Sequence, residues 1–136
     1  MTTSTLRRAD VHVGDELPQR DVPITATLVV AGALASRDFQ DVHHDSEIAK
    51  RSGAKDVFMN ILTTGGIVGR FITDWAGPET FIKKVSIRLG VPNYPHDTMR
   101  LTGRVQAVEQ DHIEVAVRGS NSLGDHVTAT IHIVLP

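Results

Sequence analysis

The feature that most constrains the fold is an alternation of apolar and polar side chains that begins near residue 80. Four segments show it: TFIKKVSIRLGV (80–91), TMRLTGRVQAV (98–108), HIEVAVRGS (112–120) and HVTATIHIVL (126–135). A period of two puts every second side chain on one face of a strand, so each segment predicts a strand with one buried face. Only Lys83 breaks the apolar face of the first segment. Because EQD and SLGD are short enough for hairpins and VPNYPHD is rich in turn residues, the sequence predicts a four-stranded antiparallel meander.

Residues 57–75, VFMNILTTGGIVGRFITDW, carry apolar side chains at helical spacing and predict a helix. This helix contains Gly65, Gly66 and Gly69, and a glycine inside a helix costs about 1 kcal/mol relative to alanine. Two explanations stay open, namely close packing against a sheet and room for a bulky ligand. One such helix ahead of a meander is most simply wrapped by the sheet. A single sheet layer leaves a face or an edge uncovered, so we expect two copies or two related chains to pair.

Upstream of this helix, a polar start over residues 1–21 is followed by PITATLVVAG (23–32), which is rich in β-branched residues and predicts a strand. The strand leads into SRDFQDVHHDSEIAKRSG (36–53), a cluster of carboxylates with two adjacent histidines. Within the cluster we expect Asp45 to cap a short helix that has Glu47 in its first turn and ends at Gly53. The cluster is therefore predicted on a connection between a strand and a helix.

Length, charge and cysteine content limit the class of protein. The 136 residues fit a single domain, and the net charge of −2 with scattered basic residues gives no footprint for nucleic acid. No apolar run reaches the roughly 20 residues that span a bilayer, and the start lacks the apolar segment of a signal peptide, so we expect a cytoplasmic protein. Because the chain has no cysteine, catalysis would have to use carboxylates, imidazoles, hydroxyl groups or the backbone.

A metal site is one interpretation of the cluster at 36–53. His43 and Glu47 are four residues apart, but a zinc site needs three or four convergent ligands. The later histidines fall singly on predicted turns and strands: His96, His112, His126 and His132. We therefore expect no metal.

Acid–base chemistry is a second interpretation of the same cluster. Asp38 and His43 would lie about 140° apart on a straight helix, so they converge only if the chain turns between them, as Gln40-Asp41 allows. A carboxylate and an imidazole that converge on one water can move its protons during addition to a polarised double bond. Spacing alone leaves the alternative open that Asp38 caps a turn and His43 is merely packed. The other ionisable groups are assigned to capping or solvent: Asp41, His44, Asp45 and Glu47.

The run ASRDFQDVHHDSEIAKRSG (35–53) resembles the signature of the MaoC-like, or (R)-specific, enoyl-CoA hydratases, Gly-Asp-x-Asn-Pro-(Ile/Val/Leu)-His followed by Asp and a small helix. The register places Asp38 on the catalytic aspartate and His43 on the catalytic histidine. RLGVPNYPHDTMRLTGRV and SNSLGDHVTATIHIVLP look like later segments of the family. The resemblance covers residues 22–135. It implies an α+β fold, a single hotdog domain over residues 1–136 whose antiparallel sheet wraps a central helix.

The chain departs from the broad family at Arg37, Gln40 and Asp41, where Gly, Asn and Pro are expected, and at Met59-Asn60-Ile61, where His-Gly-Met is usual. RDFQDVHHD, NILTTGG, ITDWAGP, IRLGVP and LGDHVTAT are similar to one branch, in which these departures are normal. That branch is the small subunit of actinobacterial two-subunit hydratases that act on steroid side-chain CoA thioesters. The resemblance implies a second subunit that contains a hotdog domain and an α2β2 heterotetramer, with a homodimer as the fallback.

The resemblance implies an enoyl-CoA hydratase subunit that adds water to an α,β-unsaturated acyl-CoA, here a steroid side-chain thioester in cholesterol or steroid catabolism. Asp38 and His43 would activate the water, and the backbone N–H groups of Asn60 and Ile61 would stabilise the enolate on the thioester oxygen. No cofactor or metal is expected, because the substrate is carried as a CoA thioester. A hotdog acyl-CoA thioesterase and a non-catalytic structural subunit are the alternatives. Candidates for contacts to CoA phosphates are Lys83, Lys84, Arg88 and Arg100.

Overall fold

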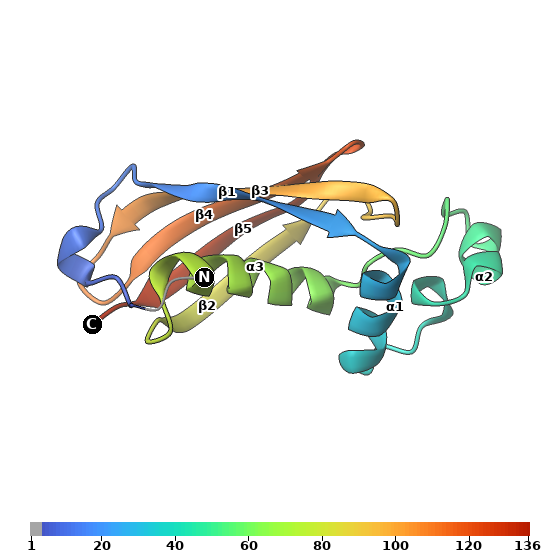
Figure 1. Ribbon diagram of the computed structural model, residues 1–136, viewed down its shortest axis with the longest axis horizontal. Helices are drawn as coiled ribbons and strands as arrows, with labels where there is room; N and C mark the ends of the chain where they lie inside the picture. The colour runs from blue at the N-terminus through green and yellow to red at the C-terminus, as the bar shows by residue number, and fades with distance from the viewer. Residues whose placement is uncertain (1–3) are drawn as a thin grey trace.

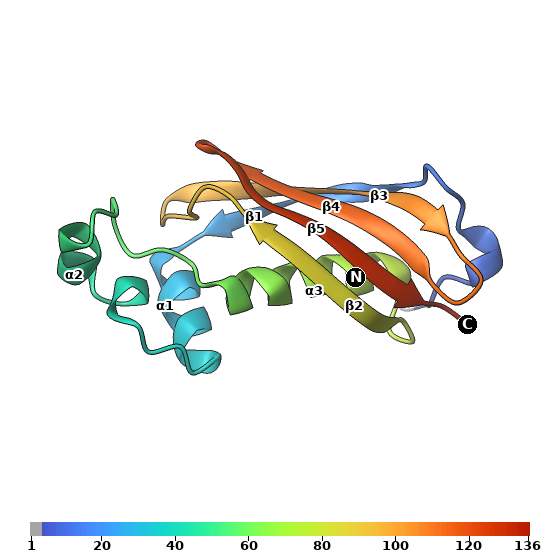
Figure 2. The ribbon, with the colours of Figure 1, turned by 180° about the vertical axis from the view of Figure 1, so that it is seen from behind.

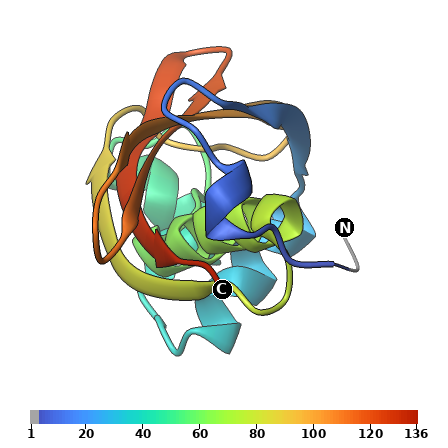
Figure 3. The ribbon, with the colours of Figure 1, turned by 90° about the vertical axis from the view of Figure 1, so that its left-hand side faces the viewer.

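In the computed structural model, which describes residues 4–136, one antiparallel sheet curls around helix α3 (Ile61–Ala76). The strands are β1 (Glu16–Ile24), β2 (Phe81–Leu89), β3 (Asp97–Val108), β4 (Ile113–Asn121) and β5 (Gly124–Val134), in the spatial order β1-β3-β4-β5-β2. Seen end-on, α3 lies inside the curl of the sheet (Figure 3). The predicted sheet around a central helix is therefore confirmed. Among residues 4–136 no helix is long and apolar enough to cross a membrane.

Shorter elements lie near the two ends of the sheet (Figure 1). They are η1 (Arg8–Asp10), α1 (Ala26–Ala35), η2 (Asp41–His43) and α2 (Ser46–Arg51). Helices α1 and α2 lie together beyond the end of the sheet from which α3 begins, whereas η1 lies at the opposite end. The cluster at 36–53 therefore lies beyond the end of the sheet from which α3 begins.

The core fills the space between α3 and the concave face of the sheet. Most of the inward-facing residues of the three central strands are buried there, including Met99, Leu101, Val105, Val115, Val117, Ile131 and Ile133. Helix α3 contributes Val68, Phe71, Ile72 and Ala76. Each larger apolar side chain buried in this way stabilises the fold by about 1.5–3 kcal/mol. The alternation seen in the sequence therefore reports correctly which face of β3, β4 and β5 points inward.

Strand β2 departs from the predicted meander. It pairs with β5 at the sheet edge and not with β3, its neighbour in the chain (Figure 2). The N–H groups of Gly90 and Val91 donate to the carbonyls of His126 and Asp125 at 2.8 and 2.9 Å, which fixes the end of β2 beside β5. The seven residues VPNYPHD are long enough to cross to the far side of the sheet, so the predicted strand order was wrong here.

The register of β2 also explains why Lys83 broke the apolar pattern. The pairing with β5 shifts between Ile82 and Lys84, so Lys83 is the extra residue of a bulge. The bulge places Ile82 opposite the buried Ile133, whereas Phe81 is 64% exposed. One inserted residue therefore exchanges the two faces of the strand at its start.

The strand predicted at 23–32 was wrong, because that segment is mostly helix α1. The Thr25 hydroxyl accepts the N–H of Leu28 at 3.0 Å and caps the helix, a signal that the β-branched composition obscured. The strand lies earlier, as β1, inside the segment expected to be a polar start; residues 1–3 of that segment are outside the described residues. Strand β1 looks polar because it is an edge strand with only Leu17 and Ile24 buried.

Candidate active site

The turn that joins α1 to η2 brings Asp38 and His43 together. Helix α1 ends at Ser36, and the N–H of Asp38 donates back to the carbonyl of Ala33 at 2.9 Å. Between them Arg37 has a φ of 58°, the left-handed conformation that favours glycine, which is the residue the broad hydratase signature has there. The chain thus makes the turn without the glycine. Oδ2 of Asp38 lies 3.4 Å from Nε2 of His43.

His43 is held in one orientation by the backbone. Its side chain is 7% exposed, and its Nδ1 lies 2.7 Å from the carbonyl oxygen of Phe58. Because a carbonyl only accepts, Nδ1–H must be the donor, which leaves Nε2 facing Asp38. The ring of Phe58 packs edge-on against the imidazole at 5.1 Å. In its neutral form His43 therefore presents a lone pair toward the carboxylate.

Asp38 is ionised at neutral pH. The amide of Asn60 donates to its Oδ2 at 3.1 Å, and this hydrogen bond lowers the pKa of Asp38 below the usual 3.8. Partial burial acts in the opposite direction, while the N–H of Gln40 and the nearby His43 also lower the pKa. A carboxylate and the lone pair of a neutral imidazole repel each other at 3.4 Å unless a proton lies between them. The pair is therefore arranged to hold a proton or a water that supplies one.

Asn60 ties this pair to the start of α3. Its side-chain oxygen accepts the N–H of Thr63 at 3.0 Å, which makes it the cap of the helix. Its amide nitrogen donates to Asp38 and also to the hydroxyl of Ser36 at 2.9 Å. Asn60 is 2% exposed. Ile61 is the first residue of the helix, so its N–H has no partner within the helix and carries the partial positive charge of the helix end.

Comparison with known proteins places this site in a family. No family model matches the chain. It is 52% identical over 121 residues to the 3-oxo-4,17-pregnadiene-20-carboxyl-CoA hydratase beta subunit of Mycobacterium tuberculosis, covering 89% of this chain and 94% of that one. The chain belongs to the family of this hydratase beta subunit.

Solved structures agree with this membership. The crystal structure of the ChsH1-ChsH2 complex from Mycobacterium tuberculosis contains a chain that is 50% identical, with a TM-score of 0.90 over 92% of this chain and 98% of that one. The R-hydratase PhaJ1 from Pseudomonas aeruginosa is 21% identical, with a TM-score of 0.85 over 97% and 86%, and shows the shared fold. The resemblance to the small subunit of a steroid side-chain hydratase is confirmed, and the fold is one shared with an (R)-hydratase.

A second buried imidazole supports the same helix end. Nδ1 of His126 donates to the carbonyl of Val91 at 2.7 Å, so Nε2 accepts the hydroxyl of Thr64, in the first turn of α3, at 2.8 Å. His126 is 2% exposed, and burial lowers its pKa because the charged form loses its solvation. Sequence reasoning missed this role. His126 stands next to Val127 and both are buried, so alternation places it on the wrong face.

The glycines of α3 are not needed for close packing. An added Cβ at Gly65 or Gly69 would meet Ile87 or Ile82 of β2 at 3.5 and 3.7 Å, which are ordinary contacts, and at Gly66 it would meet nothing within 4 Å. The close approach is elsewhere, at Gly32 of α1, where a Cβ would lie 2.3 Å from the hydroxyl of Thr63. Of the two explanations for the α3 glycines, room beside the helix is the one this geometry favours.

The remaining cluster residues of this family member have structural positions. Asp45 caps α2 by accepting the N–H of Ile48 at 3.1 Å, Glu47 lies in the first turn, and Gly53 follows the helix with a φ of 96°. Asp41 and His44 are exposed and lie 3.6 Å apart. The predicted capping and solvent-facing positions of these residues are confirmed.

The candidates for contacts to CoA are not equally available. Lys83 pairs with Asp111 at 3.0 Å and Arg100 pairs with Asp21 at 3.2 Å. Within residues 4–136 no carboxylate lies within 4.0 Å of the basic groups of Lys84 or Arg88. Arg88 borders a groove of about 830 Å³ along the sheet, whose lining includes neither Asp38 nor His43. The structure therefore does not join this groove to Asp38 and His43.

Proposed function

We propose that the chain is the beta subunit of an enoyl-CoA hydratase that adds water to the α,β-unsaturated CoA thioester of a steroid side chain. The observation that carries the proposal is the Asp38–His43 pair, in which the carboxylate and the imidazole are each oriented by a separate hydrogen bond. The 52% identical relative is a 3-oxo-4,17-pregnadiene-20-carboxyl-CoA hydratase beta subunit, which supports the substrate class.

In the proposed reaction a water bound between the two side chains donates one hydrogen toward Asp38 and the other toward Nε2 of His43. As the oxygen attacks the β-carbon, His43 takes up the proton, and the ionised Asp38 stabilises the imidazolium that forms. His43 then gives this proton to the α-carbon, so both side chains return to their starting protonation states. One molecule of water is thereby added and nothing else is released.

The negative charge that develops on the thioester oxygen needs its own donors. The N–H groups of Asn60 and Ile61 are the proposed donors, because they lie at the positive end of α3 next to the cap that contacts Asp38. The family's glycine at this position is not required, since the donor belongs to the main chain. Neither a metal nor a cofactor enters this scheme, and a CoA thioester as substrate favours the cytoplasm as its location.

We infer that a second subunit with a hotdog domain completes the substrate pocket, and that two such pairs form an α2β2 heterotetramer. Among residues 4–136 strand β2 pairs only with β5, so its other edge has free backbone groups. Apolar side chains on β2 and at the start of α3 are exposed: Phe81, Val85, Leu89, Ile61 and Leu62. A second subunit that pairs with the free edge could cover this apolar surface.

The test is hydration by the chain purified together with its candidate second subunit. Loss of the enoyl-thioester absorbance should be fast for a steroid substrate with wild-type protein and slow with His43→Ala, whereas His44→Ala, a neighbouring exposed histidine, should behave as wild type. Release of free CoA thiol would instead identify a thioesterase. Full activity of a folded complex that carries His43→Ala would leave this chain with a structural role only.

A further inference from the structure

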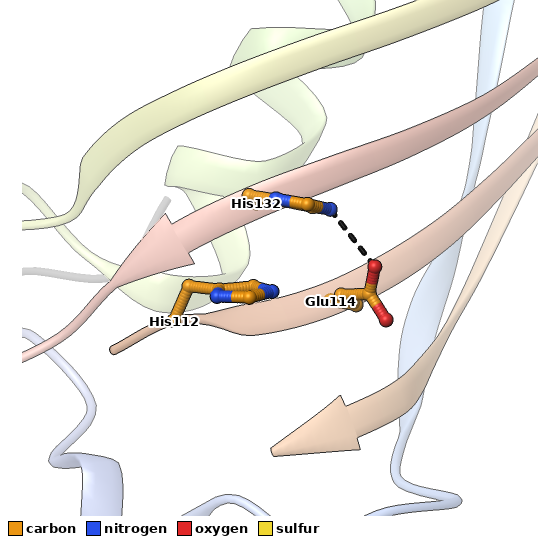
Figure 4. A group of neighbouring side chains, drawn as sticks. All are labelled: His112, Glu114 and His132. Carbon is orange, nitrogen blue, oxygen red and sulfur yellow. Dashed lines mark hydrogen bonds and ion pairs between the residues drawn. The ribbon is translucent and has the colours of Figure 1, made fainter. Parts of the chain in front are cut away.

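His112 and Glu114, which are close in sequence, meet the distant His132 on the outer face of the sheet (Figure 4). Glu114 of β4 and His132 of β5 are register partners, and they face outward because their neighbours Ile113 and Ile133 are buried in the core. His112 is two residues before Glu114 and therefore shares its face. The three side chains are 18%, 32% and 21% exposed for His112, Glu114 and His132.

We propose that His112, Glu114 and His132 bind a divalent transition-metal ion of the zinc type. One ligand atom from each residue lies within 4.8 Å of the others. Two imidazoles and one carboxylate are a common protein ligand set for zinc, with the remaining coordination position left for water. This site is independent of the proposed hydratase chemistry, since it shares no residue with it.

The geometry allows closure by side-chain rotation alone. With metal–ligand bonds of about 2.0–2.2 Å, tetrahedral ligand atoms lie about 3.4 Å apart, so no pair has to approach by more than about 1.4 Å. The two imidazole rings are stacked at 4.3 Å and 18°, and they have to tilt toward each other to bring the ion into both ring planes. The hydrogen bond of 2.9 Å between His132 Nε2 and Glu114 is then replaced by two bonds to the metal.

A fourth residue orients the first imidazole. Nδ1 of His112 donates to Oδ1 of Asp111 at 2.8 Å, which leaves the lone pair of its Nε2 available for a metal. Carboxylates that accept from the second nitrogen of a metal-binding histidine fix its tautomer and make it a better ligand.

Positive charges lie close to the cluster, so the imidazoles determine which ion it selects. Lys83 pairs with Asp111 at 3.0 Å, and Lys84 of β2 is the register partner of His132. These ammonium groups oppose any cation, so binding has to come from the imidazoles. Mg²⁺ and Ca²⁺ prefer all-oxygen sites, whereas Zn²⁺, Ni²⁺ and Cu²⁺ bind imidazole well. The cluster should therefore bind zinc and ignore magnesium.

Titration calorimetry of the metal-free full chain with Zn²⁺ at neutral pH tests the proposal. We expect saturable binding of a single ion, no heat with Mg²⁺, and loss of affinity by about tenfold or more for Asp111→Asn through the orienting contact. His112→Gln and His132→Gln should weaken binding at least as much. His12→Gln is the matched control, because His12 faces Asp15 at 3.9 Å on the surface without a third ligand nearby.

The outcomes separate the metal site from a plain surface hydrogen bond. Circular dichroism of each variant establishes that it is folded. Absence of saturable Zn²⁺ binding, or binding that survives the double variant His112→Gln/His132→Gln, would overturn the proposal and leave His132 and Glu114 as hydrogen-bond partners only.

Discussion

Two pairs of a carboxylate and an imidazole lie in different surroundings. The inner pair is Asp38–His43, beside the start of α3, and the outer pair is Glu114–His132, on the outer face of the sheet. In the outer pair the carboxylate and the imidazole are 2.9 Å apart and satisfy each other directly. In the pair beside α3 they are 3.4 Å apart, and each is held by a different group, Asn60 for the carboxylate and the carbonyl of Phe58 for the imidazole. The closer contact is therefore not the better candidate for proton transfer.

The difference lies in what the surroundings fix. A pair whose members are oriented by other groups leaves room for a water and keeps its geometry when the proton moves. A pair whose members orient only each other can rotate apart on the surface to take up a different ligand. Burial follows the same division, since the His43 side chain is 7% exposed and that of His132 is 21% exposed.

The largest expected effect breaks the inner pair and spares the outer one. Asp38→Asn in the complex should lower the hydration rate by at least about a hundredfold, because one acid–base group is worth about 10² to 10⁴ in rate. Glu114→Gln should leave the rate unchanged. Single-turnover hydration of the enoyl thioester measures both. Equal rates for the two variants would remove the distinction drawn between the pairs.

A second prediction concerns the residue that holds Asp38 in place. Asn60→Ser keeps a good helix cap but cannot reach Asp38, whereas Asn60→Ala loses both contacts. Both variants should lower the hydration rate by about tenfold or more, since loss of the positioning contact misplaces the carboxylate. Only Asn60→Ala should also lower the free energy of unfolding, by about 1 kcal/mol, measured by chemical denaturation.

The hydration rates also decide what Asn60 does. If Asn60→Ser hydrates at the wild-type rate while Asn60→Ala does not, the residue acts on the helix and not on Asp38. A shift of the acidic limb of the pH–rate profile toward higher pH in both variants is expected, because loss of the amide donor allows the pKa of Asp38 to rise.

Signals that are local in sequence were sufficient to predict much of the fold. The period-two alternation fixed the faces of β3, β4 and β5, and Asp45 and Gly53 marked the ends of α2. The spacing of Asp38 and His43 required a turn if the two were to converge, and the resemblance to hydratases implied their roles. The segment at 23–32 failed because its β-branched residues favour a strand, whereas the decisive signal was the single cap at Thr25.

Contacts that depend on strand register could not be predicted in the same way. His112 and His132 are twenty positions apart, and they meet only because Glu114 pairs with His132 across β4 and β5. His126 contacts Thr64 through an inward position that alternation does not indicate. The place of β2 beside β5 depends on the long connection VPNYPHD, whose path is set by the packing of the whole sheet.

A third prediction concerns Gly66, an exposed position on helix α3. Gly66→Val adds a side chain where an added Cβ meets nothing within 4 Å, and valine is better than glycine inside a helix, so folding should be retained. Filling this space should lower hydration of a steroid thioester about tenfold relative to a short enoyl-CoA. Gly53→Val, at the end of α2, is not a suitable control because of its positive φ, and Ser52→Val serves instead. Equal losses on both substrates would show that the space at Gly66 does not distinguish them.

The smallest expected effect concerns the buried imidazole of His126. Burial lowers the pKa of His126 in the folded state below the usual 6.5, so the unfolded chain binds the proton more readily. The stability associated with neutral His126 is present above about pH 6.5 and is lost as the pH falls through the lower, folded pKa. His126→Gln can keep both hydrogen bonds without titrating, so it should change the free energy of unfolding by less than about 1 kcal/mol at neutral pH and make its acid decline shallower. Urea unfolding of His126→Gln and of the wild type at neutral pH and near pH 5 measures both effects. An acid decline as steep in His126→Gln as in the wild type would mean that burial does not couple His126 to the start of α3.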